Sequence, residues 1–561
     1  MTDTTATARS ASGTVLMTLA TAQFLMTLDS SVMNVSIATV ASDVGTTVTG
    51  IQTAITLYTL VMASLMITGG KVGQILGRKR AFAIGCVVYG IGSFTTALAP
   101  NLTVLLIGWS LLEGMGAALI MPAIVALVAS NFPRPGRPRA YGLVAASGAI
   151  AVAVGPLIGG LLTTYASWRY VFAGEVILVL VIVVQARKMS DEPADSSARL
   201  DLVGTVLSAT GLAMVVLGVL RGGEWGFVNP KPDAPSWLGL SPVVWLVLGG
   251  GVVLRLFLAW EHRRQVAGQE VLLDPALLRN LRLRSGLMSF FFQYLLQAGL
   301  FFVVPLFLSV ALGLSAVETG VRIMPLSATL LLGAVGIPKF FPHASPRRVV
   351  RLGFLTLFVA LVALVASLEV GVGPEVVTWP LLLAGLGIGA LASQLGAVTV
   401  SAVSDERSAE VGGLQNTVTN LGASIGTALA GAVLISGLTS SFLTGIQDNP
   451  DVPADLSSQA ETDLAGGIPF LSNDQLESAL SDAGVEGDTA AAVVDENESA
   501  RIAGLRGSVA LLALIALGAL FTAGSLPRRQ PGEREDETED EDAGEDAEGE
   551  PEAGRGAPAP A

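Results

Sequence analysis

Cysteine, histidine and charge are scarce in this 561-residue sequence. The single cysteine, Cys86, lies in an apolar run, so no intrachain disulfide can form. The two histidines, His262 and His343, have no partners at metal-binding spacing, and no HExxH, Walker A or Ser/His/Asp pattern occurs. Only 14% of the residues are charged, against about 25% in an ordinary soluble protein. These absences argue against a metal centre, a nucleotide hydrolase and a soluble enzyme.

Apolar runs take the place of the missing charge. Hydrophobic residues make up 51% of the chain, and a membrane-spanning helix needs about 20 mostly apolar residues. The sequence therefore predicts an all-α integral membrane protein. Fourteen runs are long enough to span: 14–40, 49–71, 81–99, 102–130, 140–165, 170–186, 202–221, 240–260, 285–312, 319–340, 349–368, 377–402, 411–437 and 504–526.

The basic residues follow every second span. They gather at 77–80, 134–139, 186–188, 262–284, 346–351 and 527–529, whereas the other connections carry almost none. Cytoplasmic loops of membrane proteins are enriched in Lys and Arg. This alternation predicts a multi-pass plasma-membrane protein with both termini in the cytoplasm, and it agrees with an even number of spans.

The excess of acidic residues comes from two polar segments, within 448–498 and 533–552, so the net charge of −14 says little about partners. We expect the first segment to be a solvated, flexible loop with a short helix near 474–483, and the second to be disordered. The predicted organisation is a cytoplasmic tail (1–13), a six-helix bundle (14–187) and two inserted spans (200–262). A second six-helix bundle (285–526) with an outside loop at 438–503 follows, and then an acidic cytoplasmic tail (527–561).

A weak internal repeat supports two related halves. The glycine-rich runs around Gly116 and Gly387 are similar, as are those that contain Gly142 and Gly413. Both pairs have the same offset, because 387 − 116 and 413 − 142 both equal 271. A shared offset across two pairs of spans is typical of transporters that are built from repeats.

Four short motifs stand in the first half: LDSSVMNVSIA (28–38), GGKVGQILGRKR (69–80), GPLIGG (155–160) and WRYVF (168–172). In this order, and with fourteen spans, the sequence resembles the major facilitator superfamily, in its branch of fourteen-span drug:proton antiporters. The resemblance covers roughly residues 14–526. It implies two six-helix bundles plus two inserted helices, no cofactor, and a proton gradient as the energy source.

Two of these motifs point to conformational roles. The loop motif supplies glycines for a tight turn and a basic cluster that holds the loop in the cytoplasm: Gly70, Gly73, Gly77, Arg78, Lys79 and Arg80. The span-five motif, which the family associates with antiport, supplies a proline that can bend the helix and glycines that permit close packing: Gly155, Pro156, Gly159 and Gly160. We expect packing to be its main task and coupling to follow from it.

The chain departs from the family pattern at informative positions. The loop motif has Gln74 where the family carries an acid and Ile75 where it carries a base. In span four, Ser110 replaces the usual Arg and Glu113 the usual Gln, and Glu175 replaces an Asn after WRYVF. These exchanges indicate a divergent subgroup whose substrate cannot be taken over from the drug pumps.

Three intramembrane acids are the candidate proton-coupling residues: Asp29, Glu113 and Glu175. A charge within a bilayer costs ~2.5–3.5 kcal/mol on insertion scales, so such residues usually serve a pathway. At ~1.5 Å per residue, Asp29 and Glu113 fall near mid-membrane, whereas Glu175 falls shallow. For the first two residues we favour proton or substrate coupling over a structural hydrogen bond. For Glu175 an outer-vestibule role is an equal alternative.

Polar stripes replace acids in the second half. Ser289, Gln293 and Gln297 share one helical face, and so do Asn416 and Asn420. We assign all five to the substrate cavity, although helix packing is an equal alternative for the stripe that contains the two asparagines. Phe301 and the three phenylalanines at 290–292 are candidates for an apolar cavity wall, although phenylalanine side chains that face lipid are the commoner case.

The sequence thus predicts a secondary transporter: a proton-coupled antiporter that exports amphipathic or drug-like molecules by alternating access. It would act as a monomer in a lipid bilayer on a small-molecule substrate and protons, without nucleic acid. A uniporter or symporter for a metabolite or lipid-like cargo is the alternative, because of the altered loop motif and the missing Arg. A membrane enzyme or receptor is the remote alternative.

Overall fold

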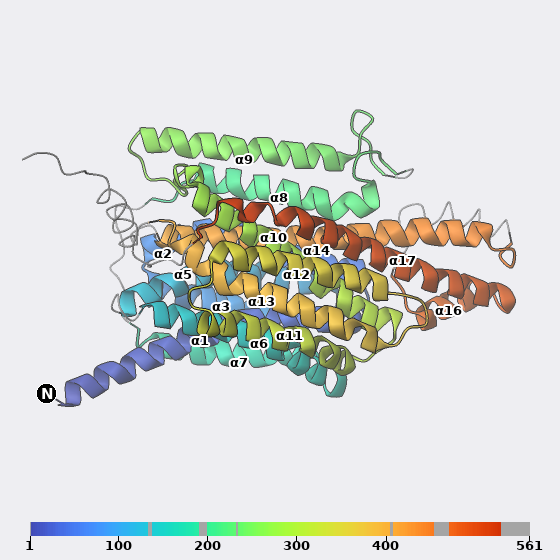
Figure 1. The fold of residues 1–561 in the computed structure, drawn as a ribbon, viewed down its shortest axis with the longest axis horizontal. Coiled ribbons are helices and arrows are strands. Elements are labelled where there is room, and N and C mark those ends of the chain that lie inside the picture. Colours follow the sequence, from blue (N-terminus) through green and yellow to red (C-terminus); the bar gives the residue numbers. More distant parts are fainter. Residues whose placement is uncertain are drawn as a thin grey trace, which may run out of the picture.

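The computed structural model describes residues 2–132, 137–189, 199–231, 234–403, 408–453, 460 and 470–528. Within these ranges the chain is helical and contains no strand, apart from one isolated bridge between Trp237 and Leu240. The helices run side by side along the longest axis of the molecule (Figure 1). The predicted all-α fold class is therefore confirmed.

The chain order is two groups of long helices with a pair between them. The first group is α1 (Thr2–Asp43), α2 (Val48–Leu76), α3 (Arg78–Ala97), the continuous α4 (Leu102–Leu105), η1 (Leu106–Glu113) and α5 (Gly114–Asn131), then α6 (Arg137–Tyr165) and α7 (Arg169–Ala186). The pair is α8 (Leu202–Trp225) and α9 (Pro242–Val266). The second group is α10 (Leu281–Leu306), which continues as η4 (Phe307–Ala311), then α11 (Ala316–Phe340), α12 (Pro346–Ser367), α13 (Thr378–Val400), α14 (Ser408–Asp448) and α17 (Asp488–Ala519).

The number of spans agrees with the prediction. Thirteen described helices are long and apolar enough to cross a membrane, and a bent pair within α6 makes a fourteenth. Each of the fourteen predicted runs coincides with one of these helices. Hydropathy succeeds here because an unpaired backbone is costly in lipid, so each crossing must be one long apolar helix.

The bend in α6 has an identifiable cause. Its two parts, Ala146–Val152 and Val154–Tyr165, meet at 42°. Pro156 lacks the amide hydrogen that would bond the carbonyl of Val152 four residues earlier. The hydroxyl of Ser327 on α11 donates to that carbonyl instead, at 3.1 Å. The proline thus creates a hydrogen bond from the second half of the chain to the first.

The internal repeat is visible in the helix packing. Gly116 of α5 lies against α3, where an added Cβ would come within 2.7 Å of the carbonyl oxygen of Gly85. Gly387 of α13 lies in the same way against α12, where an added Cβ would be 2.8 Å from the carbonyl oxygen of Gly353. The 271-residue offset therefore relates two helix pairs that approach each other through the same small positions.

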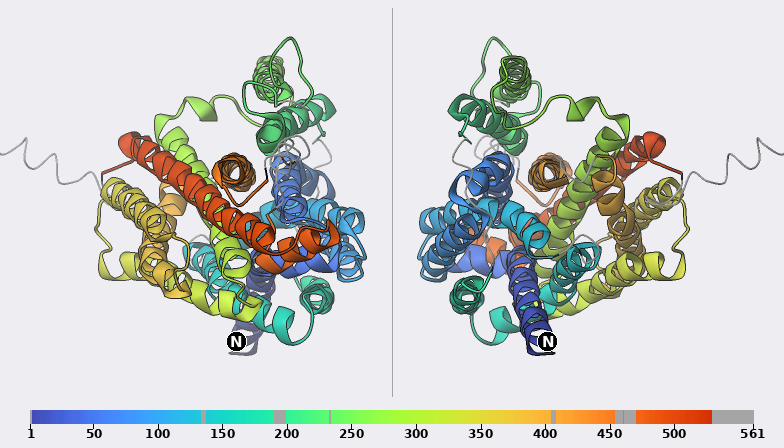
Figure 2. Two further views of the ribbon diagram at one scale, coloured as in Figure 1. Left: turned by 90° about the vertical axis from the view of Figure 1, so that its right-hand side faces the viewer. Right: turned by 90° about the vertical axis from the view of Figure 1, so that its left-hand side faces the viewer.

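The helix pair α8–α9 stands beside the two bundles (Figures 1 and 2). Leu212 and Val216 of α8 pack with Leu60 of α2 and Ile425 of α14, so α8 touches both halves. Helix α9 packs mainly on α8. Near the C-terminal end of α9, Glu270 forms an ion pair with Lys71 of α2. The inserted pair is therefore anchored where the halves meet.

Both ends of the described chain lie at the same end of the bundle, where α1 begins and α17 ends (Figure 1). We call this the terminal end, and the opposite one the α16 end after α16 (Asn473–Asp482). Helix α1 begins at Thr2, so the predicted N-terminal tail 1–13 is helical from that residue on. The acidic tail from residue 529 on lies outside the described residues.

The predicted outside loop 438–503 is largely helical. Residues 438–448 continue α14, and residues 488–503 already belong to α17. These two helices project beyond their neighbours at the α16 end (Figure 1). The short helix expected at 474–483 is present as α16. The sequence did not indicate how far α14 and α17 extend into this segment.

Arg501 connects this projecting segment to the bundle by hydrogen bonds. It is 1% exposed on α17, and its guanidinium donates to the carbonyl of Leu471 at 2.8 Å, to that of Val310 at 3.4 Å, and to the side-chain oxygen of Asn473. Hydrogen bonds to charged groups contribute ~1.5–3 kcal/mol each, and removal of the donor leaves buried acceptors unpaired. Arg501 therefore joins α17, η4 and the start of α16.

We predict that Arg501→Met loosens this segment selectively. Amide hydrogen exchange in residues 470–482 should become at least about tenfold faster, because the free energy of local opening falls by about 1.4 kcal/mol or more. Exchange in α3 and α12 should not change. Exposed Arg506 on the same helix provides the matched control as Arg506→Met. Equal exchange in the two variants would contradict the role given to Arg501.

Candidate functional site

Three carboxyl groups meet inside the first bundle. Asp29 comes from α1, Glu113 from the last position of η1, and Glu175 from α7. One oxygen of each lies within 4.8 Å of the others, and the three side chains are 0%, 0% and 1% exposed. We call these three residues the carboxyl cluster. The structure thus brings together all three of the acids that the sequence singled out.

The counted depths of Glu175 and Glu113 do not agree with their positions side by side. Counting from the start of its helix made Glu175 shallow, yet it lies beside Glu113, which the same count placed near mid-membrane. Such a count assumes that every helix starts at one level and runs straight through the bilayer. Spanning helices tilt and start at different levels, so the count fails by several residues.

A π-helical segment places Glu113. Residues 106–113 form η1 between two α-helical parts of the same span. π-Helical turns are rare and often accompany functional sites. Gly92 of α3 makes room for the carboxyl: an added Cβ would come within 2.5 Å of the Glu113 Cγ and 2.8 Å of the Gly108 carbonyl oxygen. The sequence GWSLLEGMG therefore buries a carboxyl against a glycine on the neighbouring helix.

Trp109 holds Asp29 in place. Its indole N–H lies 2.9 Å from both carboxyl oxygens of Asp29. The indole ring stacks on Tyr58 of α2, with ring centres 5.1 Å apart and planes 7° apart. A buried indole N–H seeks such a partner. Trp109 therefore combines a polar contact with Asp29 and an apolar contact with Tyr58.

Two hydroxyls can serve either protonation state of the glutamates. Thr96 lies 3.0 Å from Glu113 and 2.9 Å from the Gly92 carbonyl. Ser93 lies 3.0 Å from Glu175 and 3.3 Å from the Tyr89 carbonyl. A hydroxyl has one hydrogen to donate but can also accept. It can donate to an ionised glutamate, or donate to the backbone and accept from a protonated one.

Several polar atoms in the site have no hydrogen-bond partner. They are one oxygen each of Glu113 and Glu175, and the hydroxyls of Tyr58 and Tyr89. Within the described ranges, no Lys, Arg or His forms an ion pair with the carboxyl cluster. Three carboxylates this close and without a cation cannot all be ionised. The site must therefore hold protons or another cation.

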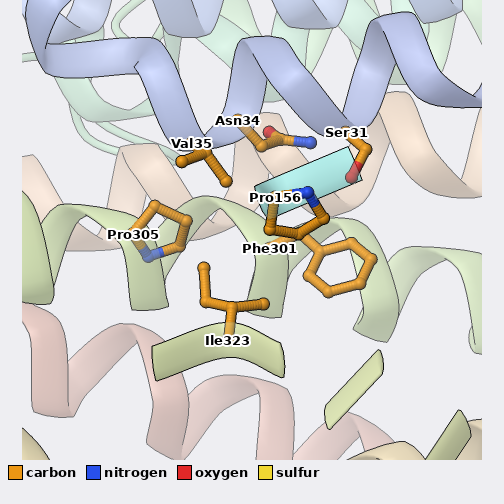
Figure 3. A pocket seen from close by; sticks show the side chains of 7 residues that line it. All are labelled: Ser31, Asn34, Val35, Pro156, Phe301, Pro305 and Ile323. Atoms are coloured by element: carbon orange, nitrogen blue, oxygen red, sulfur yellow. The ribbon is translucent and has the colours of Figure 1, made fainter. Parts of the chain in front are cut away.

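A small pocket lies between the two halves (Figure 3). Its lining comes from α1, α6, α10 and α11: Ser31, Asn34, Val35, Pro156, Phe301, Pro305 and Ile323. We call it the interhalf pocket. Two residues along an α-helix rotate the side chain by roughly 200°, so Asp29 and Ser31 face nearly opposite ways. Helix α1 therefore separates the carboxyl cluster from the pocket.

The predicted cavity residues on α10 have different surroundings. Ser289 is 0% exposed and pairs with the Thr522 hydroxyl at 3.2 Å, which ties α10 to the segment that follows α17. Gln293 is 3% exposed, and its side-chain oxygen has no partner. Gln297 is half-buried. None of the three lines the interhalf pocket, whereas Phe301, one helical turn beyond Gln297, does.

The stripe on α14 faces α2. Asn420 donates to the Asn416 carbonyl at 2.8 Å and lies 4.0 Å from the Met66 sulfur. Further along the stripe, Ser424 donates to the Thr56 carbonyl at 2.9 Å. These contacts fit a helix-packing role for the stripe, because they join one half of the protein to the other.

The two conformational motifs occupy distinct contacts. Gly77 separates α2 from α3 with φ +91°, a left-handed conformation that favours glycine. Gly70 and Gly73 have ordinary van der Waals room for a Cβ. Lys79 donates to the carbonyls of Arg187 and Met189 at 2.8 Å each, where α7 ends. A cation at a helix C-terminus satisfies its free carbonyls. Arg78 is half-buried and Arg80 is exposed.

The GPLIGG glycines lie at two different interfaces. An added Cβ on Gly155 or Gly159 would press on α1, at 2.5 Å from the Ser31 Cβ or 3.0 Å from the Val32 Cα. On Gly160 it would press on α11, at 2.8 Å from the Val317 Cα. The motif therefore packs α6 within its own bundle and against the opposite half.

Sequence reasoning missed the groups that surround the acids. Ser93 and Thr96 are one helical turn apart in an apolar span, which is a detectable polar pair. Nothing in the sequence indicated that they face Glu175 and Glu113, because that depends on how α3 is rotated. The bond from Ser327 to α6 was also missed.

Comparisons with known proteins agree with this architecture. The family model described as Major Facilitator Superfamily matches residues 19–427. The puromycin resistance protein pur8 of Streptomyces alboniger is 32% identical over 450 residues, which cover 78% of this chain and 85% of that protein. The tetracenomycin C resistance and export protein of Streptomyces glaucescens is 27% identical over 433 residues, covering 75% and 76%.

Similar solved structures share the fold. A bacterial homologue of the human lysosomal transporter Spinster, in an inward-facing and unoccupied conformation, matches with a TM-score of 0.57 at 15% identity. The match covers 92% of this chain and 97% of that one. At this identity the likeness shows a common architecture.

Proposed function

The chain belongs to the Major Facilitator Superfamily, and from this premise we propose that it is a proton-coupled antiporter of the cell membrane with both termini in the cytoplasm. It is a secondary transporter that exports drug-like molecules, in keeping with relatives that are named for antibiotic resistance or export. We place the proton on the carboxyl cluster and the cargo in and around the interhalf pocket.

One observation carries the proton assignment. The three carboxyl groups lie within 4.8 Å of one another, are almost fully buried, and have no ion-pair partner among the described residues. Such a group must exchange protons whenever its access to water changes. The Ser93 and Thr96 hydroxyls can stabilise both protonation states without moving to new partners.

Helix α1 connects the two sites. Asp29 lies on its cluster side, and Ser31 and Asn34 lie on its pocket side. A change of charge at Asp29 would alter how α1 packs against η1 and α7, and thereby the pocket. In alternating access, proton binding need only favour one arrangement of the two halves over the other. The coupling we propose is therefore indirect, through the position of α1.

The interhalf pocket favours an uncharged or weakly polar part of the cargo. Its lining holds Ser31 and Asn34 as polar groups, and otherwise proline, valine, isoleucine and phenylalanine side chains. The Asn34 amide donates to the Ser30 carbonyl at 2.8 Å, which leaves its oxygen to accept from a cargo. The pocket's volume of about 210 Å³ is below the roughly 300–1,000 Å³ of small-molecule sites, so the two halves must separate here before a cargo can enter.

Transport in proteoliposomes tests this function. With the lumen acidified, puromycin and tetracenomycin C are supplied outside, and their uptake is followed with and without a protonophore. We expect uptake of at least one compound that needs the pH gradient and stops when the protonophore collapses it. Uptake that ignores the gradient would favour a uniporter, and cotransport in the direction of proton flow would favour a symporter.

A further inference from the structure

We propose that the carboxyl cluster also binds an alkali cation, Na+ first of all, in competition with the proton. This inference rests on the proposed function, because the same residues carry both ions. It goes beyond it by naming a second ligand for the site and by predicting that sodium alters the carrier's response to pH.

The spacing of the carboxyl oxygens permits a shared ion. Oxygen ligands of a hard cation lie about 2.3–2.6 Å from it, so two ligands of one ion can be at most about 5 Å apart. One oxygen each from Asp29, Glu113 and Glu175 meets this limit, since all three lie within 4.8 Å of one another. They come from three helices of one bundle, so the set does not depend on how the two halves are arranged.

Further oxygens without partners face the same place. The hydroxyls of Tyr58 and Tyr89 are on residues 2% and 0% exposed, and neither makes a hydrogen bond. Both lie beside the Asp29 carboxyl, close enough to interact with it. One oxygen of Glu113 and one of Glu175 are also unpartnered. Buried polar atoms are seldom left unpaired, and all of these are oxygens, the ligands that hard cations prefer.

Charge balance favours a monovalent ion. A buried group of three acids is least costly when its net charge is near zero, which one cation and two protons achieve. Exchange of a third proton for Na+ leaves that total unchanged. A divalent ion would have to displace two protons at once, and Mg2+ would retain waters for which a site of 0–1% exposure offers little room.

Binding of radioactive 22Na+ to the purified full-length protein tests the proposal. Scintillation proximity is measured in choline-based buffer at pH 8 and pH 6, with unlabelled NaCl, LiCl, KCl and CaCl2 as competitors. We expect saturable binding at pH 8 that NaCl displaces better than KCl or CaCl2. The dissociation constant should rise about tenfold or more at pH 6, because carboxyl ligands must lose protons to bind a cation.

Matched variants locate the ion. Glu113→Gln and Glu175→Gln should each weaken 22Na+ binding at least about tenfold, since each removes one charged ligand. Glu261→Gln is the control, because Glu261 is also a 0% exposed acid on a spanning helix, but outside the carboxyl cluster. It should bind as the wild type does. Absence of saturable binding by the wild type at pH 8 overturns the proposal, and so does unaltered binding by both cluster variants.

The same preparations separate this inference from the proposed function. If export driven by a pH gradient persists in sodium-free choline buffer and no 22Na+ binds, the sodium site is refuted and proton antiport stands. If 22Na+ binds and the cluster variants abolish that binding, while no compound is driven by pH, the sodium site stands and proton antiport fails.

Discussion

Glu113→Gln should abolish export driven by a pH gradient. The amide keeps the shape of the side chain and can still bond Thr96, which lies 3.0 Å from Glu113, but it can no longer exchange a proton. An ion can drive a conformational change only if it binds the two states differently, and the variant removes that binding. We expect the pH-driven rate in proteoliposomes to fall about a hundredfold or more, to the level of empty liposomes.

Exchange of labelled for unlabelled cargo, without any gradient, is the internal control. It needs the pocket and the rocking of the two halves but no net proton movement, so Glu113→Gln should retain a measurable part of it. Glu261→Gln should behave as the wild type in both assays. Asp29→Asn is expected to resemble Glu113→Gln, with Trp109 still donating to its side-chain oxygen. Undiminished pH-driven export by both cluster variants would refute the assignment of the proton.

Gly160→Leu should block transport for a different reason. An added Cβ on Gly160 would stand 2.8 Å from the Val317 Cα and 3.0 Å from the Ala316 carbonyl carbon on α11. Both are backbone atoms that cannot turn aside, so α6 and α11 must separate. Overpacking of this kind typically costs about 1–3 kcal/mol. The interface belongs to both halves, so we expect both cargo exchange and pH-driven export to be lost.

The matched control is a glycine with free space. Gly174 lies on α7, and nothing would come within 4 Å of an added Cβ. Gly174→Leu should therefore transport as the wild type, and Gly160→Ala should be intermediate. Thermal unfolding in detergent checks that the Gly160 variants are folded. If a folded Gly160→Leu protein still exchanges cargo at the wild-type rate, contact between α6 and α11 at this point is not needed for transport.

The predictable part of this fold follows from the bilayer. Each of the fourteen spans could be placed because lipid requires long, apolar and internally bonded segments. The extent of α14 through 438–448 and of α17 from residue 488 on could not be predicted, since composition there does not distinguish helix from loop. The two inserted spans were placed in the chain, but their contact with α2 and α14 required the packing.

The site shows the same division. Asp29, Glu113 and Glu175 could be selected from the sequence because an ionisable group in an apolar run is costly and therefore informative. That the three acids meet could not be predicted from the sequence. Their meeting depends on the tilt of α7, the π-helical turns of η1 and the absence of a side chain at Gly92. The polar stripes on α10 and α14 could also be found in the sequence. Their role could not, because a stripe that joins two helices and a stripe that faces a cavity have the same periodicity.

By itself, the sequence determined that this chain is a fourteen-span transporter of two related halves with acids buried in the first. Hydropathy, loop charge and the cost of burial indicate the spans and the acids residue by residue, and the resemblance of the motifs to the major facilitator superfamily implies transport. Only the tertiary structure decided that the three acids form one cluster, that α1 lies between them and the interhalf pocket, and that Pro156 exposes a carbonyl for Ser327 of the other half. These features depend on the rotation and tilt of helices about one another, which packing sets across the whole bundle.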